Sequence, residues 1–483
     1  MLFNSFEFFI FFPIVFVLHW FVFKNNKLQQ NLFLLVVSYL FYSFWDWRFS
    51  LLLAFSTALD YYSGIVISNS PNLKTKRYWT RLSIFTNIGI LCYFKYTNFF
   101  IDSFLRLFNN IGFQLDPLIL NIILPIGISF YTFHGVSYVL DIYYGRTKAT
   151  NNILEYSLFV SFFPLLVAGP IERASHLLPQ LTKRRVFDYL QAVEGCRLVL
   201  WGLFKKVVVA DSLAPIVEDI FNNYENLNGI TCIIGIVGFA FQVYGDFSGY
   251  TDIARGISKL LGIELILNFN FPYFSRSIPE FWSRWHVSLS SWLNDYLFTP
   301  LALKFRNHGK FGMFLAVFTT FIIAGFWHGA GLKFIIYGAY FGLLYVPYIY
   351  SKNGIKSMVN KKSKTIEFQD ILNMIVTFSL VCIGFVFFRA DGLSQAVGIL
   401  KHVLINIKSN PSGLVYVSKG KSIIIYITFL IIVDWSLYMK LQNTKNKIAI
   451  ILQSQLTLCF IAIITMWFTF GTDESQNFIY FQF

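Results

Sequence analysis

Long apolar runs separated by short polar stretches make up most of the chain. A helix needs about 20 mainly apolar residues to cross a bilayer, so each such run is a candidate span. The runs cover residues 5–23, 29–47, 49–69, 82–101, 117–141, 193–213, 228–248, 312–329, 332–350, 369–388, 422–439 and 448–470. We therefore expect an all-α integral membrane protein with about 11–12 transmembrane helices, the first run being retained as a span.

One further apolar run, residues 153–171, does not fit as a crossing. It contains Pro164 and ends in Ala168-Gly169-Pro170, a sequence that stops a helix. A crossing here would also put the basic residues that follow it on the outer side. We predict that 153–171 is re-entrant and returns to the side it entered, which is tolerated only where the backbone is buried in protein or lines a cavity.

A second unusual segment is residues 242–310, where polar side chains interrupt the apolar pattern and prolines break it into short helices. A lipid-facing helix does not carry such residues, because each charge at the bilayer centre costs several kcal/mol. We expect the segment to line a central funnel or to lie along the interface. Its polar members are Gln242, Asp246, Asp252, Arg255, Glu280, Arg284, His286, Asn294 and Asp295.

Composition and charge agree with a membrane protein. Of 483 residues, 56% are hydrophobic and 13% are charged, about half the charge of a soluble domain. The net charge of +14 comes from short basic clusters between the apolar runs, which is the positive-inside pattern of cytoplasmic loops. We therefore expect no nucleic-acid partner. With the N-terminus outside, the loops at 24–27, 71–81, 352–364 and 440–447 are cytoplasmic, while the basic loop 389–421 is left outside. No polar linker divides residues 1–483, so we expect a single domain.

The common soluble-enzyme motifs are missing. The five cysteines are far apart and no His/Cys ligand spacing occurs, so neither a disulfide framework nor a metal site is indicated. The sequence has no G-x-S-x-G nucleophile elbow, no P-loop and no dinucleotide fingerprint.

Among seven histidines, His328 has the most unusual context. It follows Ala324-Gly325-Phe326-Trp327 at the end of an apolar run that has no charge, and Gly329 comes next. Neutral imidazole accepts a proton near neutral pH, which suits it to general base work on a hydroxyl. From these residues alone, a catalytic histidine and one that only bonds to a neighbouring helix are equally good interpretations. His134 is a weaker candidate on a helix wall.

His286 lies in the stretch from Glu280 to Trp292. At helical spacing Phe281, Trp285, Leu289 and Trp292 share one face, which predicts an amphipathic helix with tryptophan anchors. His286 is then either a satisfied interfacial histidine or a second polar group in the cavity. Asp246 and Asp252 can orient an imidazole or pair with Arg255, and pairing is the better interpretation.

Several blocks of the chain, in order, resemble the membrane-bound O-acyltransferase family, and within it the bacterial alginate O-acetyltransferase branch. The resemblance covers most of the first 345 residues. The blocks are Met1-Leu-Phe-Asn-Ser, Pro125-Ile-Gly-Ile-Ser-Phe-Tyr-Thr-Phe, Phe163-Pro-Leu-Leu-Val-Ala-Gly-Pro-Ile-Glu-Arg, Asp246-Phe-Ser-Gly-Tyr-Thr-Asp, Asn268-Phe-Asn-Phe-Pro-Tyr, Glu280-Phe-Trp-Ser-Arg-Trp-His-Val-Ser-Leu-Ser-Ser-Trp and Phe326-Trp-His-Gly-Ala.

The resemblance implies that His328 is the family's catalytic histidine and His286 the second histidine of this branch. It also implies an acyl donor such as acetyl-CoA arriving from the cytoplasm, with no tightly bound cofactor, and an acceptor on the outer side, often reached through an SGNH-hydrolase-like partner. We expect location in a bacterial inner membrane. Side chains near the two histidines are expected to bind substrate, namely Trp327, Trp285, Arg284, Asp246 and Asn294.

The chain departs from the branch after Asp295-Tyr-Leu-Phe, where a glycine-rich basic turn is usual and this sequence reads Thr299-Pro-Leu-Ala-Leu-Lys-Phe-Arg-Asn-His-Gly-Lys. Details of donor contacts near residues 299–310 are therefore not carried over. A transfer of D-alanine to teichoic acid, a transporter of lipids or acyl groups, and a scaffold that recruits an outer enzyme are the alternatives to acetyl transfer.

Overall fold

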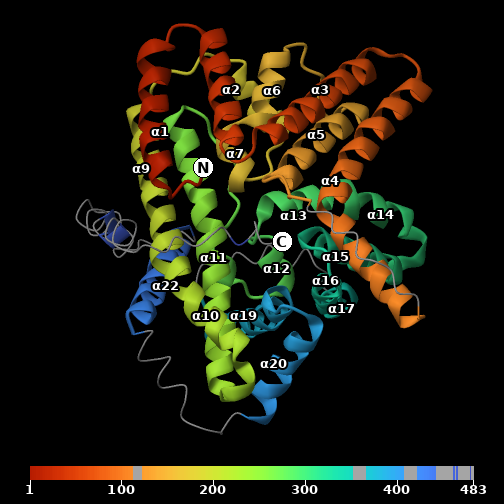
Figure 1. Ribbon diagram of the computed structural model, residues 1–483, viewed down its shortest axis with the longest axis vertical. Helices are drawn as coiled ribbons and strands as arrows, with labels where there is room; N and C mark the ends of the chain where they lie inside the picture. The colour runs from red at the N-terminus through yellow and green to blue at the C-terminus, as the bar shows by residue number, and fades with distance from the viewer. Residues whose placement is uncertain are drawn as a thin grey trace. The chain divides into compact units, whose positions relative to one another are not determined.

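The computed structural model describes residues 1–112, 122–351, 366–406 and 421–441, together with residues 461, 462, 464, 465 and 479. Within these residues every element is a helix (Figure 1). The expectation of an all-α membrane protein is confirmed. The chain folds as two compact units, one of residues 1–196 and 254–266 and the other of residues 197–253 and 267–483. The expected run 448–470 lies almost wholly outside the described residues.

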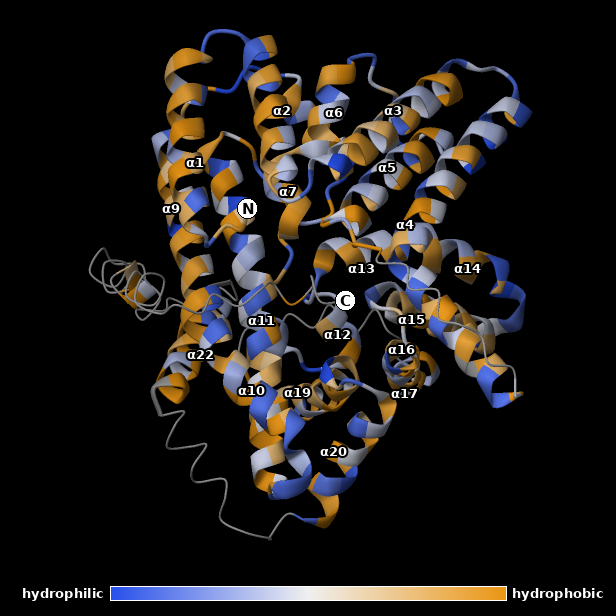
Figure 2. Cartoon of the chain, in the orientation of Figure 1, coloured by the Kyte–Doolittle hydropathy of each residue, from blue (hydrophilic) through white to orange (hydrophobic). Residues whose placement is uncertain are grey.

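Unit 1 is built from the N-terminal helices. They are α1 (Phe6–Val17), η1 (Leu18–Val22), α2 (Lys27–Ser43), α3 (Trp47–Asn69), α4 (Leu73–Asn110), α5 (Ile128–Tyr143), α6 (Ile153–Ser161), α7 (Phe163–Ala168), α8 (Ala174–Leu181) and the first half of α9 (Tyr189–Leu203). Apolar residues run along α1, and the loop to α2 is hydrophilic (Figure 2). Side-chain caps set most starts, as where Asp46 accepts from the Arg48 amide before α3.

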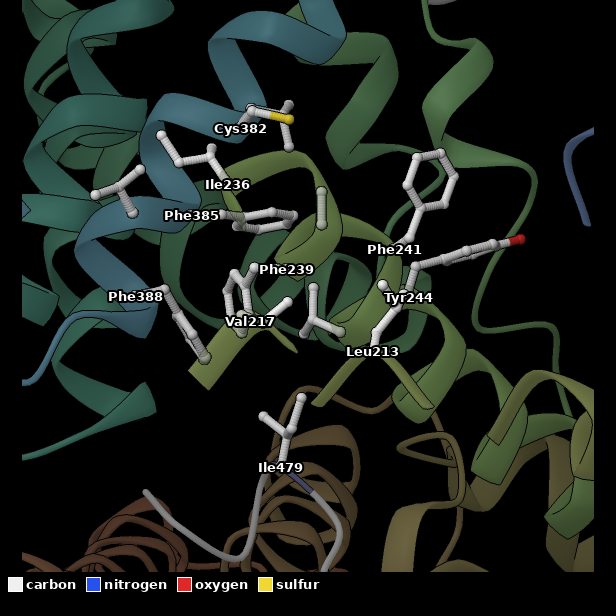
Figure 3. Packing of buried hydrophobic residues seen from close by; sticks show 14 of the residues in the cluster. Leu213, Val217, Ile236, Phe239, Phe241, Tyr244, Cys382, Phe385, Phe388 and Ile479 are labelled. Atoms are coloured by element: carbon white, nitrogen blue, oxygen red, sulfur yellow. The ribbon is translucent and has the colours of Figure 1, made fainter. Parts of the chain in front are cut away.

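Unit 2 contains the rest. Its elements are η2 (Phe204–Asp211), α10 (Ser212–Asn222), η3 (Tyr224–Asn226), α11 (Gly229–Leu260, to residue 253), η4 (Pro272–Phe274), α12 (Ile278–Trp282), α13 (Val287–Leu293), η5 (Asn294–Phe298), α14 (Thr299–Lys304), η6 (Arg306–His308), α15 (Gly309–His328), α16 (Leu332–Leu344), α17 (Val346–Tyr350), α19 (Phe368–Arg389), α20 (Leu393–Ile405) and α22 (Lys421–Leu441). Its core is an aromatic-rich cluster between α10, α11 and α19 (Figure 3).

Five helical stretches among the described residues are long and apolar enough to cross a membrane: Trp47–Asn69, Gly229–Leu260, Arg306–His328, Leu332–Tyr350 and Phe368–Arg389. Shorter apolar helices cover Phe6–Val22, Ile153–Ala168, Leu393–Ile405 and Ile423–Met439. The expected number of 11–12 spans stays a prediction.

Some boundaries differ from the sequence pattern. The run 82–101 is part of the much longer α4, and the run 193–213 continues through a π-helical stretch into α10. The expected span 117–141 falls partly outside the described residues. Its helix α5 starts only after Gly127, which has a left-handed φ of +74°. The stretch 389–421, expected to be a loop, contains α20.

The segment 153–171 doubles back along α2, as a re-entrant path requires, while its path through the membrane stays a prediction. The helix breaks at Phe162, between α6 and α7, and both pieces pack against α2 (Figure 1). At the start, Lys27 Nζ donates to Glu155 Oε1 at 2.9 Å; after the segment, Asn31 Nδ2 donates to the Leu181 carbonyl at 2.9 Å. In the middle, the Phe163 amide donates to Ser38 Oγ at 3.1 Å, about 10 Å farther along α2. The segment therefore descends beside α2 and returns to the same end.

Candidate functional site

The hairpin of α15 and α16 places His328. Glycines let the two helices meet backbone to backbone: a Cβ at Gly325 would lie 2.2 Å from the Phe334 carbonyl oxygen, and one at Gly338 would lie 2.2 Å from the Phe321 carbonyl oxygen. Close approach of this kind is the usual role of small residues between membrane helices. His328 is the last residue of α15, so its position is fixed by this rigid contact.

The imidazole of His328 lies in an aromatic enclosure and is 5% exposed. Its ring centroid is 4.8 Å from that of Trp327, 5.3 Å from that of Phe388 and 5.9 Å from that of Tyr337. Phe388 comes from the end of α19 and Tyr337 from the middle of α16. Three helices thus hold one imidazole at a largely apolar position, as its sequence context indicated.

His286 sits at a break in the chain and not within one helix. Its backbone has φ +45°, a left-handed conformation that non-glycine residues seldom adopt, and it separates α12 from α13. The expectation of a continuous amphipathic helix through this stretch is wrong. The break is held by an extended pairing, in which the Val287 amide donates to the Asn268 carbonyl at 2.8 Å and the Asn270 amide to the Arg284 carbonyl at 2.9 Å.

Hydrogen bonds around Asn268 define the tautomer of His286. The Asn268 amide nitrogen donates to Thr251 Oγ1 at 3.4 Å, so its Oδ1 is the acceptor for Ser288 Oγ at 2.8 Å and for His286 Nδ1 at 3.0 Å. His286 therefore carries its proton on Nδ1, and its Nε2 presents a lone pair. That Nε2 is buried and has no hydrogen-bond partner in the described part of the chain.

The two histidines share Trp327. The centroid of the His286 ring lies 6.4 Å from that of Trp327, whose ring in turn contacts His328. The Phe247 ring of α11 covers His286 edge-on at 4.7 Å. His286 lies between the membrane-spanning helices α11 and α15, and burial lowers its pKa to about 3. A neutral imidazole with a free acceptor nitrogen can take a hydrogen bond or a proton from a hydroxyl.

The other residues expected to bind substrate are arranged differently. Trp327 contacts both histidines, whereas Trp285 is buried among rings, stacking on Phe281 at 5.5 Å. Arg284 Nη2 donates to Glu280 Oε1 at 2.6 Å and lies over the Tyr438 ring. Asn294 is exposed at the start of η5 and donates to Asp295 Oδ1 at 3.3 Å.

Asp246 belongs to a buried charge cluster. Its Oδ1 lies 2.7 Å from Lys206 Nζ, which also lies 2.7 Å from Asp211 Oδ1. The Ile479 amide donates to Asp246 Oδ2 at 2.7 Å. Asp246 thus pairs with a lysine, as one of the two interpretations expected, although the partner is not Arg255. Removing one partner of such a buried pair strongly destabilises the folded protein, because the other charge stays buried and uncompensated.

A cavity of about 540 Å³ lies beside this region in unit 2. Tyr244 and Tyr273 line it, and the Tyr273 ring stacks on Trp285 at 6.0 Å. Asp434 also lines it, accepting from the Tyr244 hydroxyl at 2.6 Å. Neither histidine is among the lining residues, so the cavity and the histidine pair are separated by an aromatic wall.

The sequence pattern did not single out Asn268, Ser288 or Thr251, although all three stand in the blocks that carry the resemblance. Each is an ordinary polar residue whose role depends on a partner distant in the chain. No group of three or more His, Cys, Asp or Glu side chains within the described residues has an arrangement that could hold a metal ion.

Comparison with known proteins defines the class. Residues 144–387, which include both histidines, match the model of the membrane-bound O-acyltransferase (MBOAT) family. The chain is also 38% identical over 393 residues to a protein of Pseudomonas aeruginosa named "Probable alginate O-acetylase AlgI", covering 80% of this chain and 72% of the relative. The chain belongs to the membrane-bound O-acyltransferase family and is an O-acyltransferase.

Two further relatives differ in the acceptor or the acyl group that their names give. The peptidoglycan O-acetyltransferase of Helicobacter pylori is 34% identical over 413 residues, covering 78% of this chain and 74% of the relative. The teichoic acid D-alanyltransferase of Bacillus subtilis is 32% identical over 288 residues, covering 56% of this chain and 69% of the relative.

Proposed function

We propose that this protein transfers an acetyl group from a cytoplasmic donor such as acetyl-CoA to a hydroxyl of an extracytoplasmic polysaccharide, directly or through an SGNH-hydrolase-like partner that modifies the glycan. The membrane would be the inner membrane of a bacterium. The observation that carries the proposal is the contact of both His328 and His286 with the Trp327 ring, in a family whose relatives here are named for O-acetylation of alginate and of peptidoglycan.

The chemistry assigned to His328 is general base catalysis. The imidazole accepts the proton of the acceptor hydroxyl as its oxygen attacks the carbonyl carbon of the thioester. The new ester bond forms, the carbon–sulfur bond breaks, and the departing thiolate takes up the proton. The aromatic enclosure excludes water, which protects the thioester from hydrolysis during this step.

His286 is assigned a supporting role at the same place. Asn268 holds the Nδ1–H, so Nε2 is available as an acceptor for a substrate hydroxyl. Orienting that hydroxyl toward the base lowers the entropic part of the barrier. His286 is buried and neutral, and therefore suits this role better than that of a charge-stabilising group.

Acetyl transfer is favoured over transfer of D-alanine by the extent of similarity. The alginate O-acetylase relative matches 80% of this chain, whereas the teichoic acid D-alanyltransferase matches 56%.

The experiment is His328→Ala, with His308→Ala as the matched control. His308 is an exposed histidine in η6, so the control makes the same chemical change away from the site. Ester-linked acetyl on exported glycan should fall on the order of 10²-fold or more in His328→Ala, with the protein still inserted, and stay unchanged in His308→Ala.

The same pair of variants separates the other classes of function. Full acetylation in His328→Ala would contradict the catalytic assignment. It would instead agree with a scaffold that recruits an outer enzyme, for which binding of the partner matters and His328 does not. A transporter would show accumulation or loss of a solute or lipid with no ester formed by the purified protein.

A further inference from the structure

Unit 1 contains a buried arginine with no counter-charge among the residues that the structure describes. Arg185 is 5% exposed, and its Nη2 donates to Asn31 Oδ1 at 2.8 Å. Its Nε and Nη1 are buried and have no hydrogen-bond partner in the described part of the chain. Burial lowers the pKa of the guanidinium to about 10, and no acidic side chain offsets this effect. An unpaired buried charge costs several kcal/mol unless a partner of opposite sign is supplied.

The protein holds Arg185 rigidly despite this cost. Gln30 pairs with both backbone groups: its Oε1 accepts from the Arg185 amide at 3.0 Å and its Nε2 donates to the Arg185 carbonyl at 3.2 Å. Gln30 and Asn31 are themselves buried in α2. Two buried amides therefore fix one arginine, which is the arrangement of a built site and not of a stray surface residue.

A buried histidine lies near the guanidinium. His19 is 0% exposed, its ring is within reach of the Leu261 backbone, and it lies close enough to Arg185 to interact with its charge. Its place is set by the π-helical turn η1 and by Trp20, whose Nε1 donates to the Leu260 carbonyl at 2.8 Å. The N–H groups open to an acceptor are therefore those of Arg185.

The residues around Arg185 are those of a membrane–water interface. Lys183 and Arg184 are exposed just before it, and exposed apolar side chains follow at Val186, Phe187, Tyr189 and Leu190. The single acid of this stretch, Asp188, is exposed and accepts from the Gln191 amide at the start of α9. Cationic residues next to exposed apolar ones are suited to anionic lipid headgroups on the cytoplasmic leaflet.

We propose that Arg185, with His19 beside it, forms a binding site for the phosphate group of an anionic phospholipid. Val186, Phe187, Tyr189 and Leu190 contact the acyl chains, Lys183 and Arg184 attract the headgroup, and Arg185 makes the directed hydrogen bonds. A guanidinium matches a phosphate better than an ammonium does, because its planar donors bond two oxygens at once. The site lies in unit 1 and does not depend on the acyl-transfer chemistry assigned to His328.

The test measures the thermal midpoint of the purified full-length protein in neutral detergent, with titrated short-chain phosphatidylglycerol, short-chain phosphatidylcholine or inorganic phosphate. Phosphatidylglycerol should raise the midpoint and the other two should not. In Arg185→Gln, the concentration for half of the maximal shift should be at least tenfold higher. Arg184→Gln removes the same charge from an exposed neighbour and should respond like the wild type.

Arg185→Lys keeps the charge but not the planar donors, and it serves if Arg185→Gln fails to insert. It should need several-fold more phosphatidylglycerol than the wild type. Equal weakening in Arg184→Gln and Arg185→Gln would overturn the proposal in favour of general surface charge. A full response to inorganic phosphate would overturn the lipid as the source of the phosphate, and no response to any additive would overturn the site.

Discussion

Two histidines, one in each unit, have hydrogen-bond partners of opposite character. In unit 2, His286 Nδ1 donates to the neutral amide oxygen of Asn268 at 3.0 Å, and the ring is buried. In unit 1, His176 Nδ1 lies 2.8 Å from Glu172 Oε2, and the His176 side chain is 42% exposed. The carboxylate is held in turn by the Ile266 amide, which donates to Glu172 Oε1 at 2.7 Å.

The partner decides which form of the imidazole is favoured. Glu172 raises the pKa of His176 mainly through the hydrogen bond, because a carboxylate stabilises the imidazolium. Asn268 offers orientation without charge, so burial dominates and lowers the pKa of His286. A neutral ring with a fixed tautomer suits work on a hydroxyl, whereas the His176–Glu172 pair resembles a structural ion pair at the edge of unit 1.

The largest expected effect is a labelling difference that tests the path of residues 153–171, the segment just before the His176–Glu172 pair. We predict that Asn151→Cys and Lys183→Cys, both at exposed positions, are labelled by an impermeant maleimide from the same side. They should be unreactive in intact cells and reactive in inside-out vesicles, because we expect the basic cluster 183–185 on the cytoplasmic side.

The labelling uses a background in which the native cysteines are serine, so that only the introduced thiols react. Reaction of the two positions from opposite sides would mean that residues 153–171 cross the membrane. The hydrogen bonds of Glu155 and Leu181 to the first turns of α2 would then require a different explanation.

The second prediction replaces the neutral hydrogen-bond partner of His286 in unit 2 by a charged one. Asn268→Asp gives His286 a carboxylate like that of Glu172, which favours the imidazolium and places a proton on Nε2. Acetyl transfer should fall roughly tenfold or more near neutral pH, since Nε2 can no longer accept, and should recover in part as the pH rises. The measurement is the rate of ester formation by purified protein from pH 6 to 9.

Asn222→Asp is the control, because Asn222 is an exposed asparagine at the end of α10. It adds the same charge at an exposed position that makes no hydrogen bond to His286, and it should leave the rate unchanged. Unaltered activity and pH profile in Asn268→Asp would show that the proton state of His286 does not matter for transfer.

The sequence was informative where the signal is local. Pro164 and the Ala168-Gly169-Pro170 stop predicted that residues 153–171 do not form one continuous helix, as the break at Phe162 shows. The uninterrupted run before His328 also placed it correctly at the end of a helix.

The missed features depend on partners far along the chain. A left-handed histidine has no local signature, and the break at His286 is stabilised by Asn268, 18 residues away. Asp246 forms an ion pair with Lys206 where η2 and α11 are in contact. The two elements approach closely there because Gly245 and Gly249 of α11 have no side chains. The helix α20 was overlooked because its apolar run is short and flanked by basic residues.

The smallest expected effect is that of replacing the charged partner of His176 in unit 1 by a neutral one. Glu172→Gln keeps an acceptor for the Ile266 amide but removes the charge beside His176. Because the pKa of His176 is raised in the folded protein, its contribution to stability is present below the unfolded pKa of about 6.5 and is lost as the pH rises through the folded pKa. The thermal midpoint of Glu172→Gln should therefore lie below that of the wild type at pH 5.5, and the gap should shrink by pH 8.5.

Since His176 is partly exposed, the part of the gap that depends on pH corresponds to no more than about 1 kcal/mol. A gap that is equal at both pH values would mean that the two pairs differ in packing alone and not in charge.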